Sequence, residues 1–278
     1  MRFPEAAPDR APDPGRLLGP DDPSPVERRS FGRRFPAVLA CDHASRAIPR
    51  ALGTLGLLEA QLARHIAWDL GAGALALELA RRLQLPVVRG GYSRLVVDCN
   101  RRLDDPSSIA ELSDGDRIPG NLALSPADRE RRAREIFAPY HATLAAALDQ
   151  AGAATGMVPA LLAIHSFTDV FGGCARPWHC GILWDRDPRL AVPLLTALRA
   201  EPGLVVGDNE PYSGRHPSDY TVDTHGERPG RPHVCIEVRQ DLLATPAGIS
   251  AWADRLARAF EALLADPGLY VSLPPVSP

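Results

Sequence analysis

The sequence predicts an α/β protein, a three-layer α/β/α sandwich with helices on both faces of a mixed, mostly parallel sheet. Short apolar runs of strand length alternate along the chain with longer segments of helical periodicity. The 278 residues are 45% hydrophobic and 23% charged, which allows a sizeable core. The sequence contains no internal repeat and neither a GxGxxG nor a GxxxxGK loop, so nucleotide binding through either motif is not expected.

The chain is expected to divide into a proline-rich, extended or partly disordered arm at residues 1–34 and a single folded domain at residues 35–278. Formal charge is -3 without a concentrated basic stripe, so neither nucleic acid nor a membrane is an expected partner. The absence of an apolar signal core or a run of transmembrane length predicts a soluble, cytoplasmic protein. The five cysteines form no CxxC pair and are expected to be free thiols. The oligomeric state is left open.

Strands are expected where apolar runs are short and rich in β-branched residues: 37–41, from 86 onward, 95–97, 158–164, 180–183, 203–206 and 234–238. Helices are expected at 57–83, 126–151, 189–198 and 249–264. Gly71 and Gly73 should break or kink the first helix, and Pro139 should bend the second, which Gly152 would cap. The polar segment 104–121 is long for a structureless connection, and such loops often cover functional sites.

Histidines follow two of the expected strands, at 37–41 and 158–164, as His43 and His165. Carboxyl ends of parallel strands meet at one rim of a sheet, where α/β proteins place ligands. Two histidines and a carboxylate, with one position left for water, are typical of catalytic zinc. Single histidines near loops are also often surface or core hydrogen-bonding groups. Ser45 and Ser166 permit a serine-hydrolase interpretation, which the lack of a GxSxG turn disfavours.

Arginines flank the apolar run 95–97, with Asp98 and Asn100 following it. The guanidinium groups of Arg94 and Arg101 suit bidentate capture of a carboxylate. The alternative is a salt-bridged strand end with no ligand.

Glu237 stands inside the apolar run 234–238, where burial without a partner would be costly. One interpretation is a general base whose pKa is raised by partial burial. The other is a residue on the exposed side of an edge strand, paired with Arg239.

Seven sequence blocks between about residues 36 and 264 carry a family resemblance. They are Cys-Asp-His-Ala-Ser…Ile-Pro, His-Ile-Ala-Trp-Asp-Leu-Gly-Ala, Tyr-Ser-Arg-Leu-Val-Val-Asp-Cys-Asn-Arg, Pro-Tyr-His, Ile-His-Ser-Phe-Thr, Asp-Asn-Glu-Pro-Tyr-Ser and Ile-Glu-Val-Arg-Gln-Asp-Leu. In this order they resemble the N-formylglutamate amidohydrolase family. The chain departs from that family's histidine-degradation branch, which has a Pro-His-Ser-Gly type of block where this chain has Asp42-His43-Ala44-Ser45.

The family is similar in fold to the zinc carboxypeptidases and aspartoacylases, a phosphorylase/hydrolase-like α/β/α sandwich. The resemblance implies that His43 and His165 bind Zn²⁺ or another divalent metal, with Asp69 as the carboxylate ligand. The carboxypeptidase HxxE spacing is absent, since Arg46 stands three residues after His43. Asp42 therefore remains a rival for the carboxylate position.

The activity implied is hydrolysis of N-formyl-L-glutamate to L-glutamate and formate, a reaction of amino-acid degradation, by a catalytic domain at residues 35–278. The residues implied for it are Glu237 as general base, Ser93, Arg94, Asn100 and Arg101 as carboxylate-binding groups, and His141 as oxyanion support or pocket wall. Arg94 or Arg101 could also face the oxyanion, and Asp98 is expected to orient the arginines. His141 could instead be a helix-surface imidazole. Alternative functions are hydrolysis of another N-acyl amino acid or small peptide, and metal-free carboxylate binding.

Overall fold

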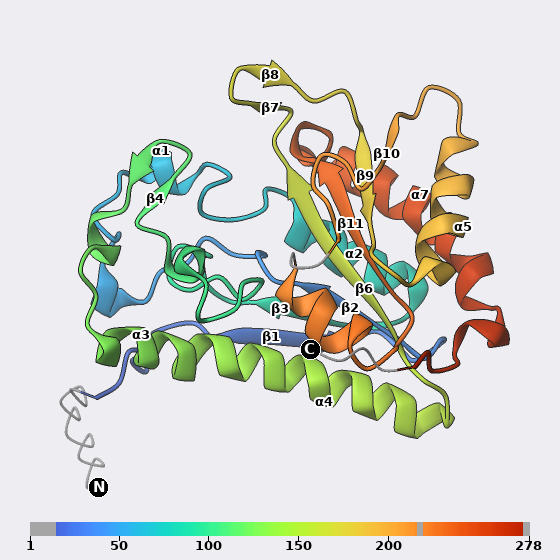
Figure 1. The fold of residues 1–278 in the computed structure, drawn as a ribbon, viewed down its shortest axis with the longest axis horizontal. Helices are drawn as coiled ribbons and strands as arrows, with labels where there is room; N and C mark the ends of the chain where they lie inside the picture. Colours follow the sequence, from blue (N-terminus) through green and yellow to red (C-terminus); the bar gives the residue numbers. More distant parts are fainter. Residues whose placement is uncertain (1–14, 216–218, 275–278) are drawn as a thin grey trace, which may run out of the picture.

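The computed structural model describes residues 15–215 and 219–274, which centre on a seven-stranded sheet (Figure 1). The strands are β1 (Val26–Ser30), β2 (Ala37–Cys41), β3 (Pro86–Gly90), β6 (Ala160–Phe167), β9 (Cys180–Leu183), β10 (Val206–Asp208) and β11 (His233–Arg239). They follow the order β1-β3-β2-β6-β11-β9-β10. The central strands β3, β2, β6 and β11 run parallel, whereas β1 is antiparallel to β3 and β9 to β11.

Helices cover both faces of this sheet, as the sequence predicts (Figure 1). The helices are α1 (Glu59–Leu62), α2 (Ala72–Leu83), α3 (Pro126–Arg132), α4 (Ala138–Thr155), α5 (Pro188–Arg199), α6 (Tyr220–Val222) and α7 (Pro246–Leu264). The α2, α5 and α7 helices pack on one face and α4 packs on the other. Each fully buried leucine at these contacts contributes about 1.5–3 kcal/mol. The α/β/α sandwich is therefore confirmed.

Alternation along β6 decides to which side of the sheet His165 points. Leu162 and Ile164 belong to the core beneath α2 and α7, and Leu161 belongs to the core beneath α4. Because successive strand residues face opposite sides, His165 points to the α4 side.

The ordered sheet begins earlier than the expected boundary at residue 35. Val26–Ser30 forms β1, which pairs with β3 along its whole length. The strand carries Glu27, Arg28 and Arg29, a charged composition suited to an exposed edge and unlike the apolar runs that predict inner strands. The part of the expected arm at residues 1–14 lies outside the described residues.

The expected strand at 95–97 is wrong. Its residues are buried, but they form turns after the chain leaves β3 at Gly90. Backbone bonds here are irregular and long-range: the Ser93 amide donates to the Ala47 carbonyl and the Arg94 amide to the Ala67 carbonyl. Composition cannot distinguish such a buried loop from a strand, because both exclude water from apolar side chains.

The predicted break of the first helical segment at Gly71 is confirmed, whereas the predicted cap of the second at Gly152 is wrong. The first helical segment consists of α1, irregular turns at 63–71 and α2, with Gly71 at φ 77° before α2. In the second, a π-helical turn (Ala133–Phe137) separates α3 from α4, and Pro139 lies in the first turn of α4. The helix passes Gly152 and ends at Thr155, with Gly156 as its left-handed cap.

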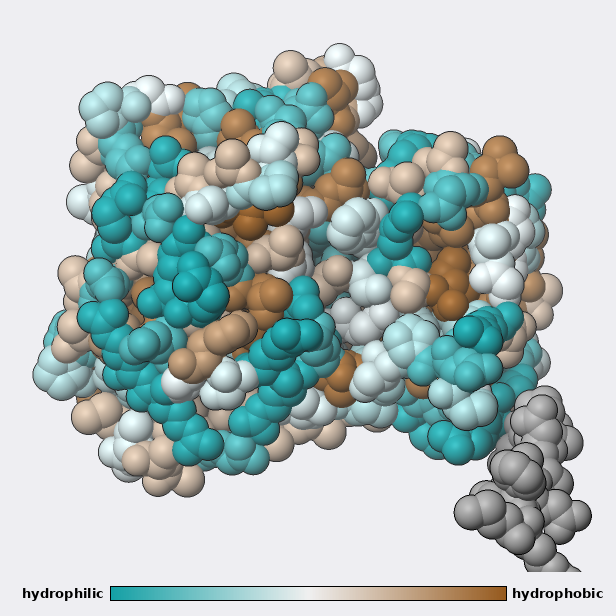
Figure 2. Space-filling model, turned by 180° about the vertical axis from the view of Figure 1, so that it is seen from behind, coloured by the Kyte–Doolittle hydropathy of each residue, from teal (hydrophilic) through white to brown (hydrophobic). Residues whose placement is uncertain are grey.

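The expected cover at 104–121 contains the small ribbon β4 (Leu112–Ser113) and β5 (Asp116–Arg117). A second ribbon, β7 (Val170–Phe171) and β8 (Cys174–Ala175), follows β6. Figure 2 shows hydrophilic residues interspersed with hydrophobic ones on the face turned away in Figure 1. Within the described residues, no helix has the length and apolar character needed to cross a bilayer.

Candidate metal centre and active site

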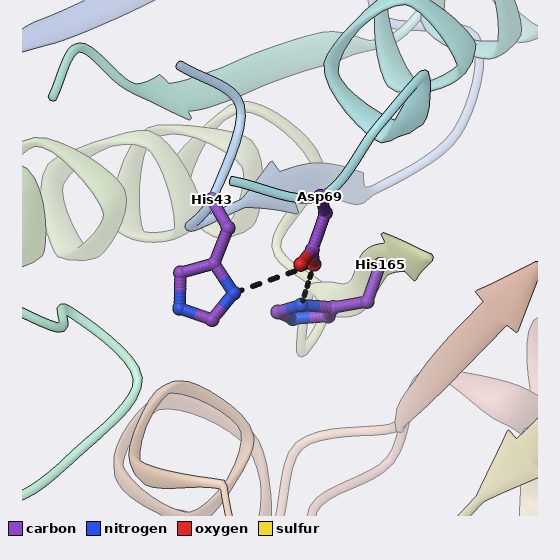
Figure 3. A group of neighbouring side chains, drawn as sticks. All are labelled: His43, Asp69 and His165. Atoms are coloured by element: carbon purple, nitrogen blue, oxygen red, sulfur yellow. Dashed lines mark hydrogen bonds and ion pairs between the residues drawn. The ribbon is translucent and has the colours of Figure 1, made fainter. Parts of the chain in front are cut away.

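Three adjacent parallel strands bring the chemistry-bearing side chains to one rim of the sheet. His43 follows the end of β2, His165 lies near the end of β6, and Glu237 lies near the end of β11. Glu237 is directly opposite His165 in the register of the two strands. Asp69 reaches the same place from the turn before α2, where its amide donates to the His43 carbonyl. Figure 3 shows Asp69 between the two imidazole rings.

His43, Asp69 and His165 form a compact, buried group. Asp69 Oδ2 lies 3.3 Å from His43 Nδ1 and 2.8 Å from His165 Nδ1. One potential ligand atom from each residue lies within 4.8 Å of the others. The spacing and the mixture of imidazole nitrogens and a carboxylate oxygen suit a zinc-type cation.

The outward-facing nitrogen of each histidine meets a further carboxylate. His43 Nε2 lies 2.7 Å from Asp98 Oδ1, and His165 Nε2 lies 3.0 Å from Asp42 Oδ2. Metal-binding histidines commonly have this arrangement, because a carboxylate on the second nitrogen fixes the ring and raises its basicity. Both histidines therefore present Nδ1 toward Asp69.

This geometry separates the two rival carboxylates. Asp69 lies where the two Nδ1 atoms converge, whereas Asp42 stands behind His165 and accepts a 2.5 Å hydrogen bond from Thr221 Oγ1. Asp98, expected to orient arginines, instead contacts His43. The role of Thr221 has no sequence signal, since it lies far along the chain from Asp42.

Three buried carboxylates surround the histidines: Asp42, Asp69 and Asp98. Burial raises each carboxyl pKa, but the charges and hydrogen bonds of the histidines outweigh burial and hold each pKa below its usual range, with the help of Thr221 at Asp42 and of Arg94 at Asp69 and Asp98. Burial lowers the pKa of His43 and His165, yet the carboxylates outweigh it and raise both. The cluster thus favours cationic charge at its centre. A divalent ion would supply the charge that protonated histidines otherwise supply, so the donor set fits a metal.

Glu237 is buried and carries an oxygen, Oε2, without a hydrogen-bond partner in the described part of the chain. Burial raises its pKa to about 8, with a further contribution from Asp69 and an opposing one from His165. A carboxyl group with a pKa near neutrality can both accept and return a proton. Glu237 is an inner-strand residue, so the interpretation as an exposed edge residue is wrong.

Arg94 connects this cluster to a cavity. Its Nη2 donates to Asp69 Oδ1 and contacts His43 Nδ1. It also lines a cavity of about 400 Å³, in the range of small-molecule sites. Other lining residues come from separated segments: Arg64, His65, Ile66, Leu70, Ser113, Asp114, Thr168, Val170, Phe171, Tyr212 and Gln240. The 104–121 segment therefore contributes to the cavity wall through Ser113 and Asp114.

Three polar atoms of the cavity residues have no hydrogen-bond partner among residues 15–215 and 219–274. They are His65 Nδ1, Arg94 Nε and Gln240 Oε1. Buried polar groups without partners are rare in proteins, and a bound ligand is one way in which they become satisfied. Burial lowers the pKa of His65 to about 4, so this imidazole is neutral near pH 7.

The other residues expected to bind substrate carboxylates are largely engaged within the protein. The Ser93 hydroxyl is buried and donates to the Ala67 carbonyl at 2.7 Å. Asn100 is also buried; its side-chain Nδ2 donates to Asp219 Oδ1, and its Oδ1 accepts from the Thr221 backbone N–H. Both side chains thus stabilise neighbouring segments.

Arg101 differs from these two residues because its side chain is 39% exposed. Its Nη1 lies 3.6 Å from Asp219 Oδ1 and donates to the Asn100 carbonyl.

His141 lies behind the 98–101 segment on α4. Its Nε2 contacts the Cys99 carbonyl at 2.8 Å and its Nδ1 contacts His225 Nε2 at 3.0 Å. With both nitrogens occupied and the ring buried, it is not a surface imidazole, and within the described residues neither of these hydrogen bonds reaches the cluster. The structure makes it a support for the backbone next to Asp98.

Comparisons with known proteins identify the family of this chain. The model of the N-formylglutamate amidohydrolase family matches residues 35–244. The structure of gene product Atu2144 from Agrobacterium tumefaciens is 34% identical, with a TM-score of 0.84, and the match covers 90% of this chain and 98% of that chain. No curated protein gives a significant match.

A second solved structure, N-formylglutamate amidohydrolase from Ralstonia eutropha JMP134, shares the fold at 20% identity and a TM-score of 0.61. That match covers 87% of this chain and 97% of that chain. The family model spans most of the described sheet, from the start of β2 past the end of β11. The chain therefore belongs to the N-formylglutamate amidohydrolase family and is an amidohydrolase that acts on linear amides.

Proposed function

We propose that this amidohydrolase uses a divalent metal, Zn²⁺ being the first choice, to hydrolyse N-formyl-L-glutamate to L-glutamate and formate. The observation that carries the proposal is the position of Glu237, directly opposite His165, which converges with His43 and Asp69. Metal-assisted amide hydrolysis needs metal-binding side chains and a proton acceptor close to each other, and the rim of the sheet supplies both.

His43, Asp69 and His165 would hold the metal, with Asp98 and Asp42 fixing the two imidazole rings. When bound, the metal would polarise the formyl carbonyl and lower the pKa of water toward neutrality. The burial of the three ligands excludes bulk water, which strengthens the electrostatic interactions at the site.

Glu237 would accept a proton from the attacking water and donate it to the leaving amine nitrogen. Its buried carboxyl and unpartnered Oε2 support both steps. Arg94 would contact the substrate from the wall of the cavity, where its Nε has no partner within the described residues. Arg101, with its partly exposed guanidinium, is the second candidate for a substrate carboxylate.

The test is a hydrolysis assay on N-formyl-L-glutamate with protein treated with chelator and then supplied with Zn²⁺. Release of glutamate should depend on the metal and return when it is restored. N-acetyl- and N-succinyl-L-glutamate, assayed in parallel, show whether the enzyme prefers to remove a formyl group or another acyl group. Faster hydrolysis of either analogue, or full activity without metal, would replace this proposal by one of the alternatives.

A further inference from the structure

The Arg176 side chain is held against the wall of the cavity by aromatic rings. Its guanidinium carbon lies 4.7 Å from the ring centroid of Phe171 and 4.9 Å from that of Tyr212. Both rings line the cavity. Stacking on aromatic faces fixes the plane of a guanidinium without neutralising its charge.

Hydrogen bonds hold one end of this guanidinium. Arg176 Nη1 donates to the Thr168 carbonyl at 3.3 Å, to Thr168 Oγ1 at 3.2 Å and to Tyr212 Oη at 3.1 Å. Within residues 15–215 and 219–274, no hydrogen bond uses Nε or Nη2. That edge of the guanidinium retains the parallel N–H groups that bind a carboxylate in bidentate fashion.

Arg176 also differs in its ion pairing from the two arginines that line the cavity, Arg64 and Arg94. Arg64 is paired with Asp114 and Asp116, and Arg94 is paired with Asp69. No carboxylate of the described residues lies within ion-pair distance of Arg176. Arg176 itself is not a lining residue, but it contacts the lining residues Thr168, Phe171 and Tyr212. Beside the cavity there is therefore one guanidinium that no carboxylate of the described residues neutralises.

We propose that Arg176 binds the side-chain carboxylate of the substrate and thereby makes the cavity selective for an acidic N-formyl amino acid. This inference rests on the proposed function. It assigns a specificity residue on the segment after β8, outside the Arg94–Arg101 stretch that the sequence indicated. Phe171 and Tyr212 act with it, because their rings line the cavity and hold the guanidinium beside it.

The experiment compares kcat/KM for N-formyl-L-glutamate, N-formyl-L-glutamine and N-formyl-L-leucine in the zinc-loaded wild type and in Arg176→Met and Arg176→Lys. Glutamine keeps the shape of glutamate without the charge. The wild type should prefer the glutamate substrate over the glutamine one. Arg176→Met should lower kcat/KM for the glutamate substrate by about 10²–10³-fold, the range for truncating one partner of a buried charge pair. Arg176→Lys should retain part of the preference.

Arg255→Met is the matched control. Arg255 stacks on Trp252 at 4.7 Å in the same manner, but Trp252, unlike Phe171 and Tyr212, does not line the cavity. This variant should keep the wild-type order of substrates. The proposal is overturned if the wild type prefers the glutamine or leucine substrate, or if Arg176→Met slows all three equally.

Failure of the proposed function is distinguishable from failure of this inference. If the wild type hydrolyses none of the three substrates, the proposed function fails. Calorimetric binding of L-glutamate and L-glutamine then tests the site directly: glutamate should bind more tightly, and Arg176→Met should abolish the difference. Equal binding of the two amino acids to the wild type, or binding of neither, overturns the assignment of Arg176.

Discussion

His43 Nε2 lies 2.7 Å from the Asp98 carboxylate, while Nδ1 of the same ring points to Asp69. Asp98 is itself held by the Asn100 amide, which donates to its Oδ1 at 2.7 Å. The Asp-Cys-Asn-Arg block thus contacts the candidate metal centre through the hydrogen bond of Asp98 with His43. From the sequence, Asn100 and Arg101 of this block were expected to bind a substrate carboxylate.

Asp98→Asn should weaken metal binding. The amide can still accept a hydrogen bond from His43 but no longer carries the charge that raises the basicity of the ring. Loss of such a partner typically lowers metal affinity by about 10- to 100-fold. Competition with a chromophoric chelator measures this change. Asp104→Asn, an exposed carboxylate paired with Arg102, is the control; equal affinities of both variants would contradict the role of Asp98.

Glu237→Gln should retain the metal and lose catalysis. Glutamine fills the same space opposite His165 but cannot accept the proton from water. Removing a general base lowers kcat by about 10²–10⁴-fold. Steady-state kinetics and elemental analysis of the same preparation provide both readouts, with exposed Glu59→Gln as control. A variant with unaltered kcat would exclude Glu237 as the base.

Gly90→Ala should displace the backbone next to the candidate metal centre. A Cβ at Gly90 would lie 2.1 Å from the Asp42 carbonyl oxygen, so the backbone that carries Asp42 and His43 must move. Such overpacking costs about 1–3 kcal/mol of stability. Gly19→Ala is the matched control, since its Cβ would meet only Asp22 Oδ2 at 3.6 Å. Denaturant unfolding and metal affinity should both change at Gly90 and not at Gly19.

The inner elements could be predicted from sequence because their signal is local. The runs that form β2, β6 and β11 are apolar and bounded by polar residues, and α2, α5 and α7 carry regularly spaced apolar residues. The edge strand β1 gives no such signal, because one edge of it faces solvent and its residues are charged. The run 95–97 gives a false one. Its turns depend on distant partners, including Arg132, which donates to the Val96 carbonyl.

The same distinction holds for the site. His43, Asp69, His165 and Glu237 stand in blocks shared with a family, so their proximity could be expected, and the structure brings them together. The contact of Asp98 with His43 and the stacking of Arg176 depend on side-chain directions that sequence spacing does not determine.

Acid should destabilise the protein through the buried pair His141 and His225. Burial, followed by the charge of His141, lowers the pKa of His225 from 6.5 to about 4. The unfolded chain takes up a proton as pH falls through 6.5, and the folded chain does so only near pH 4. This contribution to stability is therefore complete above pH 6.5 and is lost as pH falls toward 4, by about 2 kcal/mol at pH 5.

His225→Gln tests this dependence, since the glutamine amide can still donate to His141 Nδ1 but does not titrate. Urea unfolding at pH 7 and pH 5 should show a smaller loss of stability in the variant than in the wild type. An identical loss in both proteins would mean that other groups account for the acid sensitivity.

The central claim is that amide hydrolysis depends on a metal held by His43, Asp69 and His165. Titration of the metal-free wild type with Zn²⁺, with hydrolysis of N-formyl-L-glutamate followed at each step, tests it most directly. Activity should rise from the background rate and saturate at a single equivalent of zinc per chain, and His165→Ala should show neither binding nor activity. Full activity of the metal-free protein, or an active zinc-loaded His165→Ala variant, would contradict the claim.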